Sequence, residues 1–323
     1  MASITGWRSL YRLNLTITNE RSMRNDIKRR AFMSTVIGGL AAGPFVIRHC
    51  LQKREALTPN DYAEQFQKYQ ALVDVPVKPL DSVSPISLTF QPPVGNRLEY
   101  LFFSPMFYPN EFSQATAGEP DTFQVQGGNL AVDRTPKGQV IIAGKDELYK
   151  AYQPTLMSEL PKNPFTLLVQ DGRLFAAKEK GTNQKNAHAL NFSDLLSLQD
   201  MPEKPLAVGT RWSGKVGRVR PFRGFETNYE IAGLSEVAGH KTLNVRFSSK
   251  IPNLFQLLGN ADKKSDKEAT AQNAHTGNVW FDLETGLLVR QEVEMTTTVT
   301  GVPELEKKKL VVNTKFVAQL FTV

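Results

Sequence analysis

Residues 243–248 read Leu-Asn-Val-Arg-Phe-Ser, a strict alternation of apolar and polar side chains. Successive side chains of a β-strand point to opposite faces, so this period of two predicts a strand with one buried and one wet face. The same period recurs at Tyr229–Ile231, Val293–Met295 and Leu310–Leu320. One wet face is typical of antiparallel sheets, which therefore dominate the predicted fold.

The pattern extends toward the N-terminus in two places. Leu98–Phe103 carries apolar side chains on both faces, which is typical of a fully buried strand. Phe165–Val169 and Arg173–Ala177 flank Asp171-Gly172, a strong hairpin signal. Trp212 and Trp280 are expected near strand starts in the second half of the chain.

Helical signal is sparse beyond residue 84. Asp146–Tyr152 and Phe192–Leu198 are predicted as short helices. No regular strand–helix alternation occurs, which excludes a doubly wound α/β fold. We expect a mainly β domain over 84–323, an antiparallel open β-barrel or β-sandwich with a few short helices. The sequence admits a division of this domain into two halves, 84–204 and 205–323.

Residues 51–83 are expected to form a helix and a Pro-rich linker. Thr58 is a candidate N-cap, Pro59 suits the first helical position, and apolar side chains recur at helical spacing through Val73. The prolines that follow, Pro76 and Pro79 among them, predict an extended spacer between the domain and a membrane.

The N-terminal 50 residues predict export. Lys28-Arg29-Arg30-Ala-Phe32-Met resembles the twin-arginine signal, in which two arginines precede an aromatic residue, and a weakly apolar run without charge continues to Ile47. Arg29, Arg30 and Phe32 are the targeting residues, and the twin-arginine (Tat) export machinery is the implied partner. An ordinary membrane anchor is the alternative.

Two features of this signal stay open. Gly39-Leu40-Ala41 is a small-x-small cleavage site, but apolar residues continue beyond it, so release and an uncleaved anchor in the cytoplasmic membrane are both compatible. Met23 is an alternative start that would shorten the charged region before the apolar run. Either way we expect the body in the periplasm or on the outer face of the cytoplasmic membrane.

The charge distribution argues against nucleic acid as a partner. The chain has a net charge of +7, but residues 1–50 hold eight basic and two acidic side chains, and the rest of the chain is nearly neutral. A phosphate-neutralising surface is therefore not indicated. The single cysteine, Cys50, excludes an internal disulfide.

The second half carries turn and core residues in a recognisable order: Pro205 to Trp212, Tyr229 to Gly233, Val237 to Thr242 and Gly277 to Arg290. This order resembles the uncharacterised exported bacterial β-proteins that have incomplete, lipoprotein-carrier-like barrels. The resemblance covers about the last third of the chain. It implies an open barrel with an apolar concave face, and it implies no catalytic residue.

No catalytic, cofactor or metal site is predicted. His188, His240 and His275 have no His or Cys at ligand spacing and are expected in turns or on the surface. Glu292 and Glu294, with Arg290, are expected to form a solvated charge stripe. No P-loop, Gly-x-Ser-x-Gly elbow or dinucleotide-binding motif occurs.

One local feature suggests binding of an anion. Four basic residues lie among glycines near Phe222, and they are Lys215, Arg218, Arg220 and Arg223. They are weak candidates for an anionic polymer or lipid headgroup, with an exposed twisted hairpin as the alternative.

The expected function is that of an exported cell-envelope protein without an evident catalytic site, which binds an apolar ligand, a lipid or a protein partner. The alternatives are an envelope hydrolase with a dispersed site and a membrane-tethered structural or interaction module. The predicted inward positions, which either line a cleft or fill a core, are Phe247, Val289, Val293, Phe316 and Leu320.

Overall fold

The predicted strands form one antiparallel sheet. The computed structural model describes residues 59–81, 85–109, 113, 118–153, 156–159, 164–170, 173–176, 201–202, 206–216, 225–251, 270–301 and 309–322. Several sequence predictions lie outside these residues: the export signal with Arg29, Arg30 and Phe32, the predicted helix 192–198, His188, and Arg218, Arg220 and Arg223.

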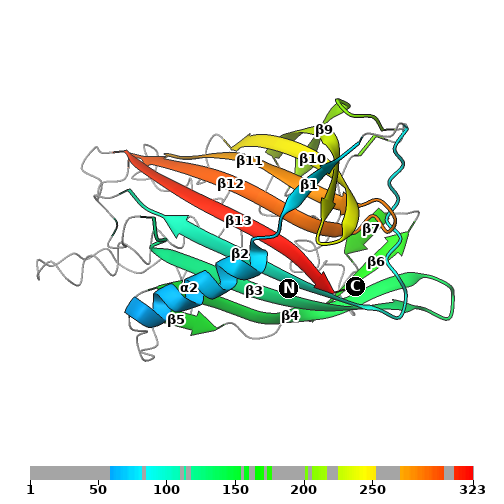
Figure 1. Cartoon of the computed structure of the whole chain (residues 1–323), viewed down its shortest axis with the longest axis horizontal. Coiled ribbons are helices and arrows are strands. Elements are labelled where there is room, and N and C mark those ends of the chain that lie inside the picture. Colours follow the sequence, from blue (N-terminus) through cyan, green and yellow to red (C-terminus); the bar gives the residue numbers. More distant parts are fainter. Residues whose placement is uncertain are drawn as a thin grey trace, which may run out of the picture. The chain divides into compact units, whose positions relative to one another are not determined.

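The described sheet is 13-stranded, in the order β1-β9-β10-β11-β12-β13-β2-β3-β4-β6-β7, with β5 beside β4 and β8 beside β9 (Figure 1). The strands are β1 Val77–Leu80, β2 Arg97–Phe107, β3 Thr122–Arg134, β4 Val140–Gln153, β5 Leu156–Glu159, β6 Pro164–Gln170, β7 Arg173–Ala176, β8 Arg211–Val216, β9 Phe225–Val237, β10 His240–Ile251, β11 Thr270–Asp282, β12 Leu288–Thr300 and β13 Leu310–Thr322. The prediction of a mainly β, antiparallel fold is confirmed. Helix α2, Pro59–Val73, is the one helix in the described part of the chain.

Strands from the two predicted halves meet in the middle of this sheet. β13, near the C-terminus, pairs with β2 in a register that places Ala318 opposite Phe102. The hairpin prediction is also confirmed at its strands, because β6 and β7 are antiparallel with Gln170 opposite Arg173. Both halves therefore belong to one continuous hydrogen-bonded sheet.

One face of the sheet, called here the inner face, carries the largest apolar core. Its buried side chains come from strands far apart in the sheet order, including Leu174 of β7, Leu130 of β3 and Phe281 of β11. Phe90, from the segment that precedes β2, joins the same cluster. Strands that are distant in the sheet order can share one core only if the sheet curves around it.

Helix α2 covers the opposite, outer face over β2 and β3 (Figure 1). Its apolar stripe packs against Phe103 and Phe123, and Phe66 lies with its ring centroid 5.8 Å from both of those rings. The Tyr62 hydroxyl donates a 2.8 Å hydrogen bond to the carbonyl of Pro120. This explains why Leu98–Phe103 is apolar on both faces: Leu98 faces the inner core and Phe103 faces the helix.

A buried arginine fixes the end of α2 to the sheet. Arg290 of β12 is only 4% exposed, and its Nη1 donates to the carbonyl oxygen of Val73 at 2.6 Å and to Oε1 of Gln319 at 2.8 Å. Its Nη2 lies 2.6 Å from Oε1 of Glu292. The predicted solvated stripe is therefore wrong at Arg290. The guanidinium supplies positive charge at the carbonyl end of a helix that has no basic residue in its own last turn.

A bulge corrects the predicted facing of Val289. The register of β11 against β12 shifts between Trp280 and Phe281, which pair with Arg290 and Leu288. The extra residue, Val289, packs with Trp280 on the outer face instead of the inner one. A bulge places one additional residue against a single partner and so breaks the alternation that the sequence displays. The predicted inward positions Phe247, Phe316 and Leu320 do pack on the inner core.

Two other predictions are wrong. Asp146–Tyr152 forms part of β4 instead of a helix, with Tyr152 opposite Phe123. Its helix-favouring sequence is overridden because β3 supplies strand partners along one side of this segment and β5 supplies partners to Lys150–Tyr152 on the other. Trp212 lies at the start of β8 as predicted, but Trp280 lies near the end of β11.

Part of the Pro-rich connector is built into the sheet. Val77–Leu80 pairs with β9, so that Pro79, which has no N–H to donate, sits in an edge strand. Farther along, Ile86 and Leu206 exchange two backbone hydrogen bonds. No helix of the described residues is both long enough and apolar enough to span a membrane.

Candidate functional site

A row of polar side chains crosses the inner face of the sheet from β9 to β3. Thr227 lies opposite Ser249, Ser249 opposite His275, and His275 opposite Met295. The row continues through Thr314, Met106 and Thr122. We call the five polar members of this row, Thr227, Ser249, His275, Thr314 and Thr122, the polar row. Directly opposed side chains lie within contact distance of each other, so the row is continuous.

The period-two alternation places the polar row on the inner face. Thr227 precedes Tyr229 and Ile231 at intervals of two, and Thr314 precedes Phe316 and Ala318 in the same way. All of these apolar side chains belong to inner-face clusters. The pairings of β12 with β13 and of β2 with β3 contain no register shift. The polar residues of these strands therefore face the same side as the apolar residues with which they alternate.

Every member of the polar row is buried, yet several of its polar atoms lack a partner. The hydroxyl oxygens of Thr122, Thr227 and Thr314 have almost no exposed surface and make no hydrogen bond. Leaving a buried polar group without a partner costs about 1–3 kcal/mol. Three such hydroxyls on one row therefore indicate a place where water or a bound molecule supplies the missing partners.

Asn273 adds an amide to this site. It lies one inward position from His275 on β11, between Ile251 of β10 and Thr297 of β12. The side chain is 3% exposed, and neither Oδ1 nor Nδ2 has a hydrogen-bond partner. A primary amide both donates and accepts, so the unmatched capacity here exceeds that of a hydroxyl.

Apolar side chains border the polar row on both sides. On one side Phe247, Gly277, Val293 and Phe316 lie opposite one another across four strands. The Phe247 ring lies over Gly277, where a Cβ would come within 2.8 Å of the ring atom Cζ. On the other side lie Ile251 and Val312, which are buried. The margins also hold buried polar residues, Asn273 and Thr297 on one side and Ser104 and Gln124 on the other, so the site is a polar row with mixed, mainly apolar margins.

The polar row is uncharged at neutral pH. His275 is its one titratable side chain, and burial lowers the pKa of this imidazole to about 4. Its neighbours in register, Ser249 and Met295, carry no charge. The prediction that His275 lies in a turn or on the surface is wrong, because it stands within β11 and is buried.

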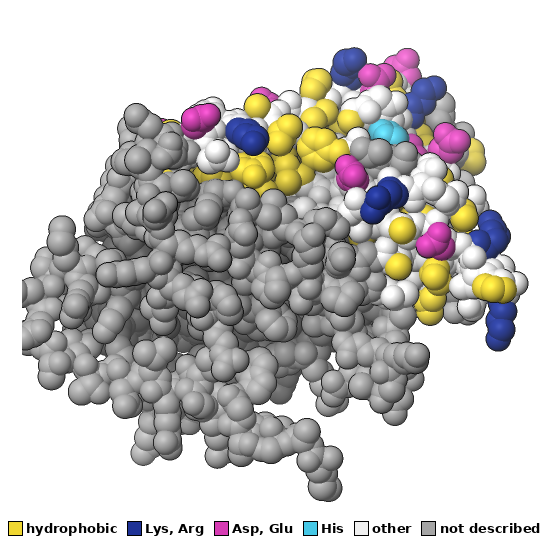
Figure 2. All heavy atoms as spheres, turned by 90° about the horizontal axis from the view of Figure 1, so that it is seen from below, with side chains coloured by type: hydrophobic (Ala, Val, Ile, Leu, Met, Phe, Trp, Pro, Cys, Tyr) yellow, Lys and Arg dark blue, Asp and Glu magenta, His cyan; other side chains and the backbone are white. Residues whose placement is uncertain are grey.

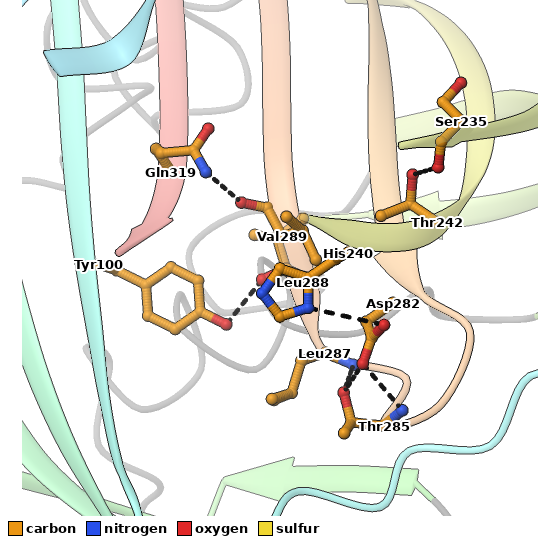
Figure 3. Close-up of polar contacts among 10 residues, drawn as sticks. All are labelled: Tyr100, Ser235, His240, Thr242, Asp282, Thr285, Leu287, Leu288, Val289 and Gln319. Atoms are coloured by element: carbon orange, nitrogen blue, oxygen red, sulfur yellow. Dashed lines mark hydrogen bonds and ion pairs between the residues drawn. The ribbon is translucent and has the colours of Figure 1, made fainter. Parts of the chain in front are cut away.

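A second polar cluster surrounds the turn from β11 to β12 (Figure 3). The Asp282 carboxylate accepts hydrogen bonds from the backbone N–H and the hydroxyl of Thr285, at 3.1 and 2.6 Å, and lies 3.7 Å from Nδ1 of His240. His240 thus begins β10 next to a turn, in keeping with its predicted place. The Thr285 hydroxyl thus bonds to the carboxylate and not to the imidazole, and the same carboxylate oxygen also accepts from the backbone N–H of Thr285, as in a side-chain-capped turn.

This turn is held against other segments of the chain by close packing and hydrogen bonds. Gly286 has a φ of 69°, and a Cβ there would lie 2.5 Å from the carbonyl oxygen of Thr89. The N–H of Gln91 donates to the carbonyl of Thr285 at 2.6 Å, and the Tyr100 hydroxyl donates to the carbonyl of Leu288 at 2.8 Å (Figure 3). These polar groups of the turn are therefore satisfied within the protein, in contrast to the hydroxyls of Thr122, Thr227 and Thr314.

The predicted anion-binding candidates are only partly described. The backbone of Lys215 lies in β8, opposite Glu226, and the other three residues lie outside the described part. On the face shown in Figure 2, basic and acidic side chains mix over the described surface. Among the described residues, no group of three or more His, Cys, Asp or Glu side chains could hold a metal ion.

The polar row was not predicted, because the sequence predictions rested on charged and apolar residues. A signal was present: the inward series Leu310, Val312, Phe316, Ala318 and Leu320 leaves a gap at Thr314. An uncharged polar residue at an inward position breaks the apolar pattern of a strand. Comparison with protein-family models and with curated proteins finds no match to this chain.

Proposed function

We propose that this protein is a noncatalytic, exported binding protein of the cell envelope that holds a ligand on the inner face of its sheet. The twin-arginine-type signal around Arg29 and Arg30 supports export to the periplasm or to the outer face of the cytoplasmic membrane. The curvature implied by the shared inner core supports an open barrel as the finer description of the sheet.

The observation that carries the binding function is the set of unpartnered polar atoms on the inner face. Elsewhere in the described part, Arg290, Gln319 and Tyr100 are buried and hydrogen-bonded. Single polar atoms of Trp212, Asn244, Trp280 and Gln291 also lack a partner, but these four residues do not line up in a single row of directly opposed residues. A core that served only to fill the sheet would gain stability from valine in place of Thr227 or Thr314. Keeping these hydroxyls lowers the stability of the fold, as is expected where a surface serves to bind a ligand.

Native mass spectrometry of the full chain, purified from the envelope fraction, tests this proposal. We expect a bound molecule that adds mass to the native protein and is lost after denaturation. Protein that carries no additional mass, and that takes up neither lipid nor apolar probe when these are supplied, would contradict the proposal.

A hydrolase is the second candidate, and one observation favours it. Ser249 and His275 lie directly opposite each other on β10 and β11, as a nucleophile and its base would need to. An imidazole whose pKa is about 4 is a weak base at neutral pH, which argues against this role. Ester hydrolysis by the full chain that is abolished by Ser249→Ala would establish it over the binding proposal.

A further inference from the structure

We propose that the ligand of the inner face is an uncharged amphiphile, whose hydroxyl and carbonyl groups bond to the polar row and Asn273 while its apolar part lies along the bordering residues. This inference rests on the proposed binding function and specifies the ligand class. It is carried by the hydroxyls of Thr122, Thr227 and Thr314 and by the amide of Asn273, all buried and without a partner.

The chemistry of these groups selects a neutral partner. Hydroxyls and amides both donate and accept, so they match hydroxyl and ester or amide carbonyl groups. Along the row, neither the five polar members nor the two interposed methionines carry a compensating charge for an ion. Burying an unpaired carboxylate or phosphate next to them would cost several kcal/mol, which disfavours charged lipids.

The apolar margins require that the ligand is not polar throughout. Phe247, Val293 and Phe316 border the row on one side, and Ile251 and Val312 on the other. Met106 and Met295 interrupt the row itself, and flexible thioether side chains adapt to irregular apolar groups. A ligand with one polar segment and an apolar chain satisfies both the polar row and its margins.

Isosteric substitutions separate a ligand site from an ordinary core. Thr227→Val and Thr314→Val each remove an unpartnered hydroxyl without changing side-chain volume much. We expect each to raise the melting temperature of the ligand-free full chain and to weaken binding of monooleoylglycerol about tenfold, the equivalent of about 1.4 kcal/mol. Asn273→Leu should weaken binding at least as much.

Thr242→Val is the matched control. Thr242 is fully buried, but its hydroxyl donates a 2.8 Å hydrogen bond to the carbonyl of Ser235 (Figure 3). It neighbours the inward Leu243 and therefore faces the outer side. We expect this variant to lower the melting temperature and to leave the affinity for monooleoylglycerol unchanged.

Affinities of the delipidated full chain for monooleoylglycerol, oleate and octadecene complete the test. We expect monooleoylglycerol, the neutral amphiphile, to bind at least tenfold more tightly than oleate or octadecene. Equal binding of all three, with no loss in the three variants, would overturn the ligand class while leaving a binding function in place. Stabilised variants with unchanged affinity would show that the polar row holds only water and would also overturn it. Failure of every probe, together with no bound mass in the purified protein, would refute the proposed function itself.

Discussion

The side chain of Arg290 and the carbonyl oxygen of Val73, separated by 217 positions in sequence, are joined by a 2.6 Å hydrogen bond from Nη1. Val73 is the last residue of α2, and Arg290 lies in β12. The same guanidinium bonds to Gln319, whose Nε2 donates to the carbonyls of Val289 and Leu320. The end of the helix and two central strands are therefore held by one buried cation.

Arg290→Met should destabilise the full chain by about 2–4 kcal/mol, because it leaves the Val73 carbonyl and the Gln319 amide without their donor. Urea denaturation measures this change. Arg211→Met is the control, since Arg211 pairs with Glu230 on the surface and its side chain is 76% exposed. We expect that variant to lose at most about 1 kcal/mol. Equal losses in the two variants would contradict the role assigned to Arg290.

Stability should depend on pH through His275. Its folded-state pKa of about 4 lies below the ordinary histidine pKa of 6.5, so the unfolded chain binds the extra proton between these values. Stability is then lost as pH falls from 6.5 toward 4, by at most about 1.4 kcal/mol per pH unit from this residue. His275→Gln should flatten the curve in this window. Parallel curves for wild type and His275→Gln would show the assignment to be wrong.

Gly277→Ala should destabilise the protein by about 3 kcal/mol, because the new Cβ would overlap the carbonyl oxygen of Glu292 and press on the Phe247 ring. Thermal unfolding of the full chain measures the loss. Adding Phe247→Leu relieves only the contact with the ring, so the double variant should not recover wild-type stability. Full recovery would mean that the backbone overlap carries no cost.

Export should depend on the arginine pair. Changing Arg29 and Arg30 together to Lys keeps the charge but loses the paired guanidinium groups, so a folded reporter fused to the chain should stay in the cytoplasm. Cell fractionation measures its distribution. Changing Arg21 and Arg24 to Lys is the matched control and should leave export intact. Undiminished export of the Arg29 and Arg30 variant would exclude the twin-arginine route.

The sequence by itself determined the antiparallel β class and most strand positions. A period of two is a local property, and it needs only a sheet with one face turned toward a core. The same local reasoning placed α2 correctly, since Pro59 and the aromatic spacing act within a few residues. It also indicated the inward facing of Phe247, Phe316 and Leu320.

Which polar residues are buried, and which groups they contact, depends on long-range contacts. Arg290 is buried where it meets the end of α2, which lies far away in the sequence, and no local pattern encodes such a contact. The bulge at Val289 reversed its facing through pairing with β11, and strand partners on both edges overrode the helical preference of 146–152. The polar row likewise exists only in the register of seven strands, which joins Thr227 to Thr122 across more than a hundred residues of sequence. Register is set by long-range hydrogen bonding and packing, so the site emerges only when the sheet is assembled.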